Sequence, residues 1–267
     1  MRPCRRLAWL SGLLVCRLEL WGCDMAYPGG KDGSGVWQRI VNELPPHDVF
    51  ISAFLGDCAI LRRKRPAGWN IGIDLDGSVC SRFVDRVPTG FAASFDLFCC
   101  DAVEWLANAF DLDRLVGPVY ADGTVGRFGV PRDRVLVYAD PPYLASSRKG
   151  SKKLYRYEMS EERHRALLHV FRRLPCLLVV SHYPCDLYDK GLSMWRSFTF
   201  QAGTRRGPAT EKVWLNFPPA SELHDVRFLG GDKREREKFC RRRRNLMRRL
   251  LELPVVERQS ILAELQG

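Results

Sequence analysis

Seven apolar, β-rich runs are spaced along the chain, and their order limits the folds that it can adopt. They are 49–55, 69–75, 95–100, 134–139, 176–183, 195–202 and 211–217. The first five are separated by helix-like or mixed segments, and their apolar residues are continuous, which indicates parallel strands buried on both faces of a sheet. The linker before the last run, GTRRGPAT, is too short for a parallel crossover, so the last two runs predict an antiparallel hairpin.

The segments between these runs carry helical patterns. The clearest is 160–174, where Ser160 is placed to cap the helix and apolar residues recur at helical spacing. Residues 101–110 and 34–43 predict two more helices, and two helices are expected after Pro219. The pattern predicts an α/β fold with a seven-stranded, mostly parallel sheet that ends in an antiparallel hairpin.

Polar residues follow four of the predicted strands where each strand ends. They are Gly56 and Asp57, then Asp74 and Asp76, then Asp101, and finally Asp140 to Tyr143. Ligands of open α/β sheets bind at the carboxyl ends of the strands, and an acid after the second strand is placed to bind ribose hydroxyls. Each acid alone is more typical of a turn or a helix cap, but four along one sheet edge favour a ligand site.

Six pieces of the sequence resemble motifs of the Dam-like adenine-N6 DNA methyltransferases, especially the short phage-type members. They are YPGGK at 27–31, FLG at 54–56, NIGIDLD at 70–76, DAVEWL at 101–106, YADPPY at 138–143 and TEKVWLNF at 210–217. The pieces occur in the order of that family and cover about residues 25–219. The resemblance implies the Rossmann-like fold of methyltransferases that depend on S-adenosylmethionine.

The resemblance also implies S-adenosylmethionine as the cofactor and suggests which residues bind it. They are Tyr27 and Lys31 at the methionine end, Phe54 and Gly56 under the chain turn, Asp74 at the ribose and Asp101 at the adenine. No metal is expected, because neither CxxC pairs nor Cys-His spacings of the zinc type occur.

The stretch YADPPY is where the chemistry of this family would take place. The N6 amine of adenine is a poor nucleophile, because its lone pair is delocalised into the ring. Two acceptors that bind its N–H groups, the carboxylate of Asp140 and the carbonyl of Pro141, would direct that lone pair toward the methyl donor. The prolines keep the turn stiff, and Tyr143 is expected to stack on a base flipped out of the duplex.

The loop after the first strand departs from the pattern of the family. Relatives have a Glu-Pro-Phe-x-Gly-Gly-Gly type loop, whereas this chain has Ser52 in place of the acid, followed by Asp57 and Cys58 near Gly56. Asp57 adds negative charge and Cys58 adds bulk where glycines would let the backbone approach the cofactor. Two outcomes stay open, a weaker cofactor site or a decayed enzyme.

Two loops and the C-terminal tail are candidates for contact with double-stranded DNA. The loops 144–159 and 203–210 mix basic residues with hydroxyls and aromatics, and the residues expected to touch DNA are Arg148, Lys149, Lys152, Lys153, Arg205 and Arg206. Of the net charge of +11, Asp232 to Arg249 contribute +7, from ten Lys and Arg less three Asp and Glu. Both loops and the run Arg241–Arg244 could equally be solvated surface.

The sequence divides into three regions. Residues 1–24 predict an N-terminal extension without structure, 25–219 a methyltransferase domain and 220–267 a basic helical tail. The ten cysteines are scattered, which indicates reduced thiols and a cytoplasmic protein. No apolar stretch is long enough for a membrane span, and a monomer is expected.

The predicted function is methyl transfer from S-adenosylmethionine to N6 of adenine in DNA, in a phage, a prophage or a mobile element. Transfer to N4 of cytosine or to adenine in RNA is an alternative, because the same turn would serve any exocyclic amine. A DNA-binding relic without activity is another. A small-molecule methyltransferase is disfavoured by the basic loops and tail.

Overall fold

The seven predicted strands form one sheet in a computed structural model, which describes residues 5–7, 31, 35–87, 94–110, 124–125, 128–148, 153–204 and 207–265. The strands are β2 (Val49–Ala53), β3 (Trp69–Asp74), β4 (Phe95–Cys99), β7 (Val135–Ala139), β8 (Leu177–His182), β9 (Arg196–Thr204) and β10 (Gly207–Leu215). Their order across the sheet is β4-β3-β2-β7-β8-β10-β9.

The pairing of these strands confirms the predicted Rossmann-like methyltransferase fold. β4, β3, β2, β7 and β8 are parallel to one another. β10 enters antiparallel between β8 and β9, and β9 pairs with it as a hairpin. The chain order of the sheet reverses between β2 and β7, and this is the switch point where open α/β sheets bind ligands.

Three further strands were not predicted. β1 (Arg5–Leu7) pairs antiparallel with β4 and adds an eighth strand to the sheet, so the expectation that residues 1–24 lack structure is wrong at these three positions. The edge strand β4 offers unpaired backbone groups, and three residues of almost any sequence can satisfy them. β5 (Thr124–Val125) and β6 (Val130–Pro131) form a separate antiparallel pair.

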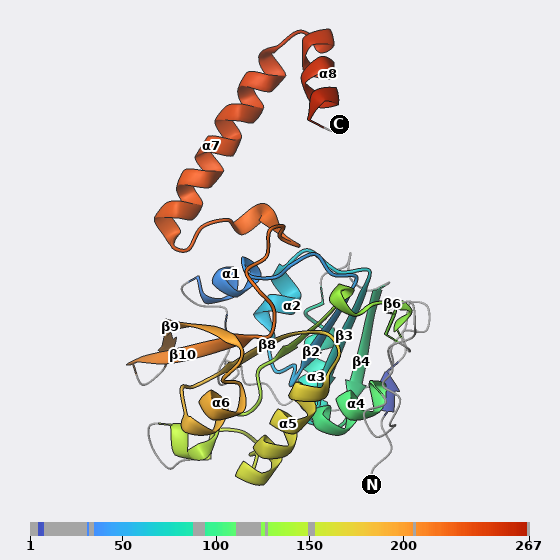
Figure 1. The fold of residues 1–267 in the computed structure, drawn as a ribbon, viewed down its shortest axis with the longest axis vertical. Coiled ribbons are helices and arrows are strands. Elements are labelled where there is room, and N and C mark those ends of the chain that lie inside the picture. The colour runs from blue at the N-terminus through green and yellow to red at the C-terminus, as the bar shows by residue number, and fades with distance from the viewer. Residues whose placement is uncertain are drawn as a thin grey trace.

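Helices cover both faces of the sheet, as the continuous apolar strands predict (Figure 1). They are α1 (Val36–Val41), α2 (Ala59–Arg63), α3 (Gly77–Val84), α4 (Ala102–Ala109), α5 (Glu161–Arg173) and α6 (Asp186–Gly191). Short 3-10 turns occur at Arg132–Arg134, Ala145–Ser147 and Val226–Phe228. The Ser160 side chain caps α5 by accepting a hydrogen bond from the Arg163 amide, as predicted.

Adjacent residues of each strand enter two different cores. In β2, Phe50 packs with α1, α2 and α3, whereas Ile51 packs with α4 and α5 on the other face. Both side chains are fully buried. The sheet is therefore the middle of three layers, and only its carboxyl edge and its loops are free to hold ligands.

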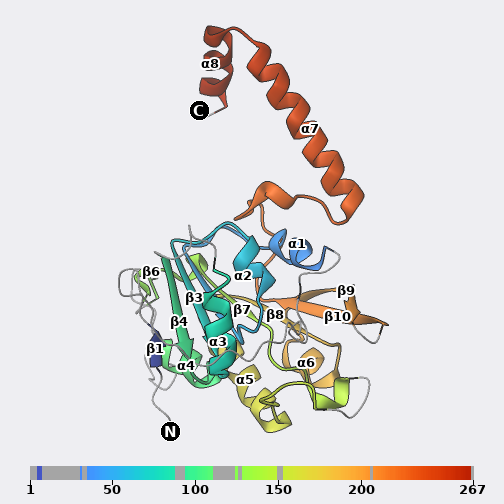
Figure 2. The ribbon, with the colours of Figure 1, turned by 180° about the vertical axis from the view of Figure 1, so that it is seen from behind.

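The C-terminal helices stand away from this body. α7 (Lys233–Glu252) and α8 (Val255–Glu264) form a helical hairpin above α1, seen from both sides in Figures 1 and 2. Neither helix has a buried residue. Both helices were predicted after Pro219. In the part of the chain that the structure describes, no helix is long and apolar enough to cross a membrane.

Candidate active site

The turn after β7 lies at the carboxyl edge of the sheet beside the turn after β2. Ala53 and Ala139, the last residues of these strands, are register partners, and Ala53 also pairs with Ile73 of β3. The loops that follow the three strands therefore leave the sheet side by side. The register brings Asp140, Phe54 to Gly56, and Asp74 to the same edge, as the sequence predicts.

Lys31 lies at the centre of a buried cluster of charged and phenolic groups. Its Nζ is 2.9 Å from Oδ2 of Asp140 and 3.0 Å from Oε2 of Glu211. It also donates a hydrogen bond of 2.5 Å to the hydroxyl of Tyr143, which donates in turn to Glu211 over 3.1 Å. The side chains of Lys31 and Glu211 are 4% exposed, and that of Asp140 is 19% exposed.

The electrostatics of this cluster favour a charged lysine and a carboxylate that is easily protonated. Burial lowers the pKa of Lys31, but the carboxylates of Asp140 and Glu211 outweigh it and raise that pKa well above its usual value. Burial raises the pKa of Asp140, and Glu211 raises it further, although Lys31 opposes both effects. One ammonium shared by two carboxylates leaves the cluster with excess negative charge when all three groups are ionised.

Tyr143 is more enclosed than a base-stacking residue would be. Its side chain is buried, with the ring edge-on to Tyr183 at 4.4 Å and tilted against His182 at 4.9 Å. The ring that was predicted to stack on a base is therefore not accessible in this structure, because it is buried against Tyr183 and His182. The neighbouring ring of Tyr183 is partly exposed and lies beside the turn.

His182 holds the turn from below. Its Nε2 accepts a hydrogen bond of 2.8 Å from the Leu144 amide, so the ring proton is on Nδ1 and is directed to the carbonyl of Tyr183, 2.8 Å away. The ring stacks on Tyr188 at 4.2 Å, and the hydroxyl of Tyr188 is hydrogen-bonded to Nδ1 of His164. Burial lowers the pKa of His182 to about 3 and that of His164 to about 4, so both rings are neutral supports.

A second arrangement surrounds the carboxylate of Asp74 at the end of β3. Oδ2 accepts a hydrogen bond of 2.8 Å from the Gly56 amide, and Oδ1 accepts one of 2.8 Å from the Asp76 amide. The loop reaches Asp74 because Phe54 and Gly56 adopt left-handed backbone conformations, with φ of 60° and 50°. Phe54 is the one non-glycine residue with a positive φ in the described chain, which marks this loop as strained.

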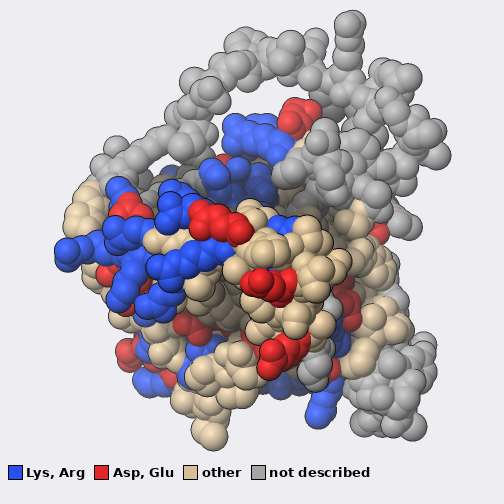
Figure 3. All heavy atoms as spheres, turned by 90° about the horizontal axis from the view of Figure 1, so that it is seen from above, with Lys and Arg blue, Asp and Glu red and all other residues tan. Residues whose placement is uncertain are grey.

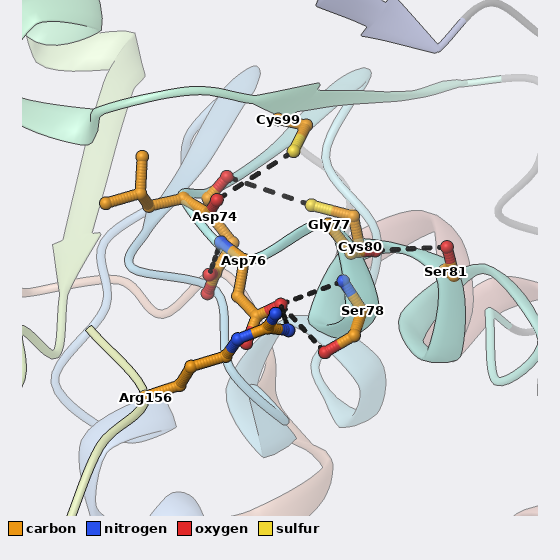
Figure 4. A network of polar contacts seen from close by, with 9 residues as sticks. Asp74, Asp76, Gly77, Ser78, Cys80, Ser81, Cys99 and Arg156 are labelled. Carbon is orange, nitrogen blue, oxygen red and sulfur yellow. Dashed lines mark hydrogen bonds and ion pairs between the residues drawn. The ribbon is translucent and has the colours of Figure 1, made fainter. Parts of the chain in front are cut away.

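The other two acids of this edge cap helices. Asp76 accepts hydrogen bonds from the amide and hydroxyl of Ser78 and faces Arg156, as Figure 4 shows. Asp101 caps α4 through the amides of Val103 and Glu104 and pairs with Arg163 at 2.6 Å. The turn-and-cap interpretation of these acids is thus correct for both, and contact between Asp101 and an adenine stays a prediction.

The unusual loop residues are accommodated locally. The carboxylate of Asp57 lies 3.1 Å from Arg62 and 3.3 Å from Arg86, which balance its charge. The thiol of Cys58 is turned into the protein, where it accepts a hydrogen bond from the Leu61 amide and caps α2. Neither side chain acts as the free charge or the projecting bulk that the sequence suggested.

The predicted DNA contacts are only partly described. Arg148 is bound to both carboxylate oxygens of Glu158, at 3.0 and 2.6 Å, and its side chain is 9% exposed. It fixes the loop after the turn and is not free for DNA, which corrects the prediction for this residue. Lys153 is exposed. The remaining predicted residues lie outside the described residues, namely Tyr27, Lys149, Lys152, Arg205 and Arg206.

Two functional candidates were missed in the sequence. Glu211 lies within the quoted stretch TEKVWLNF, but Thr210 and Lys212 flank it in β10, so no local pattern distinguishes it from a solvated acid. His182 is the last residue of β8, and its position at the carboxyl edge of the sheet is the signal for it. In the described part of the chain, no group of His, Cys, Asp or Glu could hold a metal ion.

No protein-family model and no curated protein matches the chain. Solved structures with a similar arrangement include an rRNA methylase from Streptococcus thermophilus, with 16% identity and a TM-score of 0.39 over 67% of this chain and 93% of that one. A SAM-dependent methyltransferase from Agrobacterium tumefaciens has 9% identity and a TM-score of 0.40, over 68% and 60%. The 23S rRNA methyltransferase ErmE has 11% identity and a TM-score of 0.39, over 73% and 70%. The fold itself is assigned by the strand order.

Proposed function

We propose that the chain is an S-adenosylmethionine-dependent DNA methyltransferase that methylates N6 of an adenine flipped out of the duplex. The observation that carries this proposal is the placement of Asp140. Its carboxylate stands at the tip of β7, at the switch point of the sheet, and is bound by the buried Lys31. It is followed by two prolines that fix the backbone carbonyls of the turn.

This arrangement suits the activation of an exocyclic amine. An ionised Asp140 has about four acceptor positions, and Lys31 uses only part of them. The remaining ones, with the carbonyl of Pro141, would accept the two N–H groups of the amine and orient its lone pair. Because Lys31 holds the carboxylate of Asp140, and Glu211 and Tyr143 hold Lys31 before any substrate binds, little reorganisation is needed during the reaction.

Tyr143 acts in this proposal as a positioning residue, because its hydroxyl joins Lys31 to Glu211. The stacking partner of the flipped base is instead Tyr183, which is partly exposed and touches Tyr143 edge-on. A single aromatic face is sufficient for stacking of any base, so selection of adenine would depend on hydrogen bonds to the turn.

The residues at the ends of β2 and β3 fit an adenosyl cofactor. S-adenosylmethionine would supply a methyl group activated by its positive sulfur. Asp74 presents a buried carboxylate whose two oxygens each accept one amide hydrogen, which leaves lone pairs for ribose hydroxyls. The left-handed turn from Phe54 to Gly56 brings the Gly56 amide to that carboxylate. The pairing of Asp57 with Arg62 and Arg86 supports a working site over a decayed one.

The test is to incubate the full chain with S-adenosylmethionine and duplex DNA, digest the DNA to nucleosides and quantify methylated bases by mass spectrometry. We expect N6-methyladenine from duplex DNA. N4-methylcytosine in DNA, or N6-methyladenine only from an RNA substrate, would replace the proposed acceptor. Calorimetry of S-adenosylmethionine binding distinguishes an enzyme from an inactive DNA-binding relic, because a relic would neither bind the cofactor nor methylate any substrate.

A further inference from the structure

A pocket separate from the Asp140 cluster lies between α1, β9 and the base of α7. Its volume is about 470 Å³, and it is lined by Gly35, Arg39, Gln201, Gly231, Lys233 and Arg236, among others. The cations come from two helices that are far apart in the sequence. A pocket of this size holds a phosphate group and the sugar attached to it.

Two of the three cations that line the pocket, Arg39 and Arg236, have no carboxylate partner among the described residues, and the third, Lys233, lies 3.8 Å from Glu237. Nε of Arg39 is buried without a hydrogen-bond partner, while its guanidinium lies over the ring of Phe198 at 5.0 Å. Among the described residues, no carboxylate lies within 4.0 Å of Arg39 or Arg236. The acid that lines the pocket, Asp232, accepts the Glu235 amide as the cap of α7. Unpaired guanidinium groups of this kind bind phosphate oxygens well.

Positive charge continues from the pocket along α7. Between Lys238 and Arg249 the helix has no acid, and its cations are Lys238, Arg241, Arg242, Arg243, Arg244, Arg248 and Arg249. All of them are exposed, and Figure 3, which looks down on this end of the molecule, shows lysine and arginine side chains crowded on one side. A helix of this length spans about 30 Å, close to one turn of duplex DNA.

The base of α7 is fixed to the body. Nδ2 of Asn42 donates to the carbonyls of Phe228 and Gly230, at 2.8 and 3.1 Å. The ring of Phe228 packs edge-on against Trp37 at 4.6 Å. The pocket and the start of the helix are thus held in one orientation relative to α1.

The pocket is also connected to the catalytic cluster through the terminal hairpin. Phe200, which lines the pocket, is the register partner of Glu211. Side chains of directly opposed residues in an antiparallel pair lie on the same face, about 5 Å apart at Cβ. A nucleic-acid backbone seated in the pocket would therefore lie on the face of the hairpin that holds Glu211 and Lys31.

We propose that the pocket formed by Arg39, Lys233 and Arg236 binds a backbone phosphate of double-stranded DNA, and that α7 extends this contact along the duplex. The choice of DNA rests on the proposed function. The contact is independent of sequence, because its donors are phosphate-binding cations, and the amide of Gln201, which also lines the pocket, donates to the Thr210 hydroxyl.

The test measures binding of the full chain to a fluorescein-labelled duplex by anisotropy, without S-adenosylmethionine, between roughly 50 and 200 mM salt. The pocket variant is Lys233→Gln with Arg236→Gln, and the helix variant is Arg241→Gln with Arg244→Gln. The matched control loses the same charge elsewhere, by Arg132→Gln with Arg172→Gln, both exposed. Arg236→Lys keeps the charge and guards against a purely structural effect, because Arg236 also donates to the Gly230 carbonyl.

We expect the pocket and helix variants each to reduce the slope of log affinity against log salt by about 2, and to weaken binding about tenfold at 100 mM salt. The control and Arg236→Lys should match the wild type. An unchanged slope in the pocket variant would overturn the proposal, as would equal losses in the control. A duplex that binds as expected but is not methylated would contradict the proposed function alone, because this binding needs no methyl transfer.

Discussion

Replacing Glu211 by glutamine tests the buried cluster at the residue that the sequence did not reveal. The change keeps the shape of the side chain and removes one of the two negative charges that face Lys31. The Oε2 atom of Glu211 is 3.0 Å from Nζ of Lys31, and Oδ2 of Asp140 is 2.9 Å from it. The two carboxylates are therefore no more than about 6 Å apart.

At this separation, two negative charges repel each other by about 3 kcal/mol with an effective dielectric constant near 20. Glu211→Gln removes this repulsion, so the pKa of Asp140 should fall, since Glu211 is one of the groups that raise it. Lys31 keeps Asp140 as a partner, and the loss of one charged hydrogen bond should lower the free energy of unfolding by about 2 kcal/mol. Glu211→Ala, which also leaves a cavity, should lower the free energy of unfolding by about 3–5 kcal/mol.

The assay is the pH profile of methyl transfer under single-turnover conditions. If an ionised Asp140 is required, the acid limb of the wild type lies above the range of an ordinary aspartate, because its pKa is raised. In Glu211→Gln that limb should move to lower pH, while urea unfolding reports the loss of stability. A limb that stays in place, or moves up, would refute the coupling between Glu211 and Asp140, whatever happens to stability.

Three other predictions concern the supports of the site. The folded state lowers the pKa of His182 to about 3 and of His164 to about 4, below the unfolded value of 6.5, so stability is complete above that pH. The free energy of unfolding, measured in urea, should therefore fall by about 2 kcal/mol per histidine between neutral pH and pH 5. The control is His169→Gln, an exposed position, and this variant should show the same fall as the wild type. Asp57→Ala should leave S-adenosylmethionine affinity unimproved in calorimetry, since Arg62 and Arg86 already balance that charge; tighter binding would contradict this. Tyr183→Ala should raise the KM for DNA at least about tenfold through lost stacking, and Tyr183→Phe should keep most activity; equal losses in both would exclude stacking.

The fold could be predicted from the sequence because each strand of the sheet contains a continuous apolar run that is visible in the sequence. The hairpin was predicted by the length of a linker, which is a local property. The short helices α2, α3 and α6 were not specified, whereas α1 and α4, which are as short, were predicted, so length alone does not decide whether a short helix is found. β1 was missed because its pairing depends on an open edge of β4 far along the chain.

The candidate site was predicted where a motif marks it and missed where only the tertiary structure does. Asp74 and Asp140 end strands and were identified by that position. The bonds of Lys31 to Glu211 and of Arg148 to Glu158 join segments whose contact no local pattern encodes. The same is true of Asp57, whose charge seemed harmful in sequence and is balanced by Arg62 and Arg86 in the structure.

The most direct test of the account is the rate of methyl transfer by Asp140→Ala and Asp140→Asn in a single turnover. If Asp140 orients the target amine, the alanine variant should lose about 10²–10³ in rate, the usual effect of removing one preorganised polar group. The rate of Asp140→Asn, which keeps an acceptor oxygen but no charge, should lie between that of the wild type and that of Asp140→Ala. Duplex binding should persist in both variants, because phosphate contacts dominate affinity. Methylation by Asp140→Ala at the wild-type rate would contradict both the mechanism and the site.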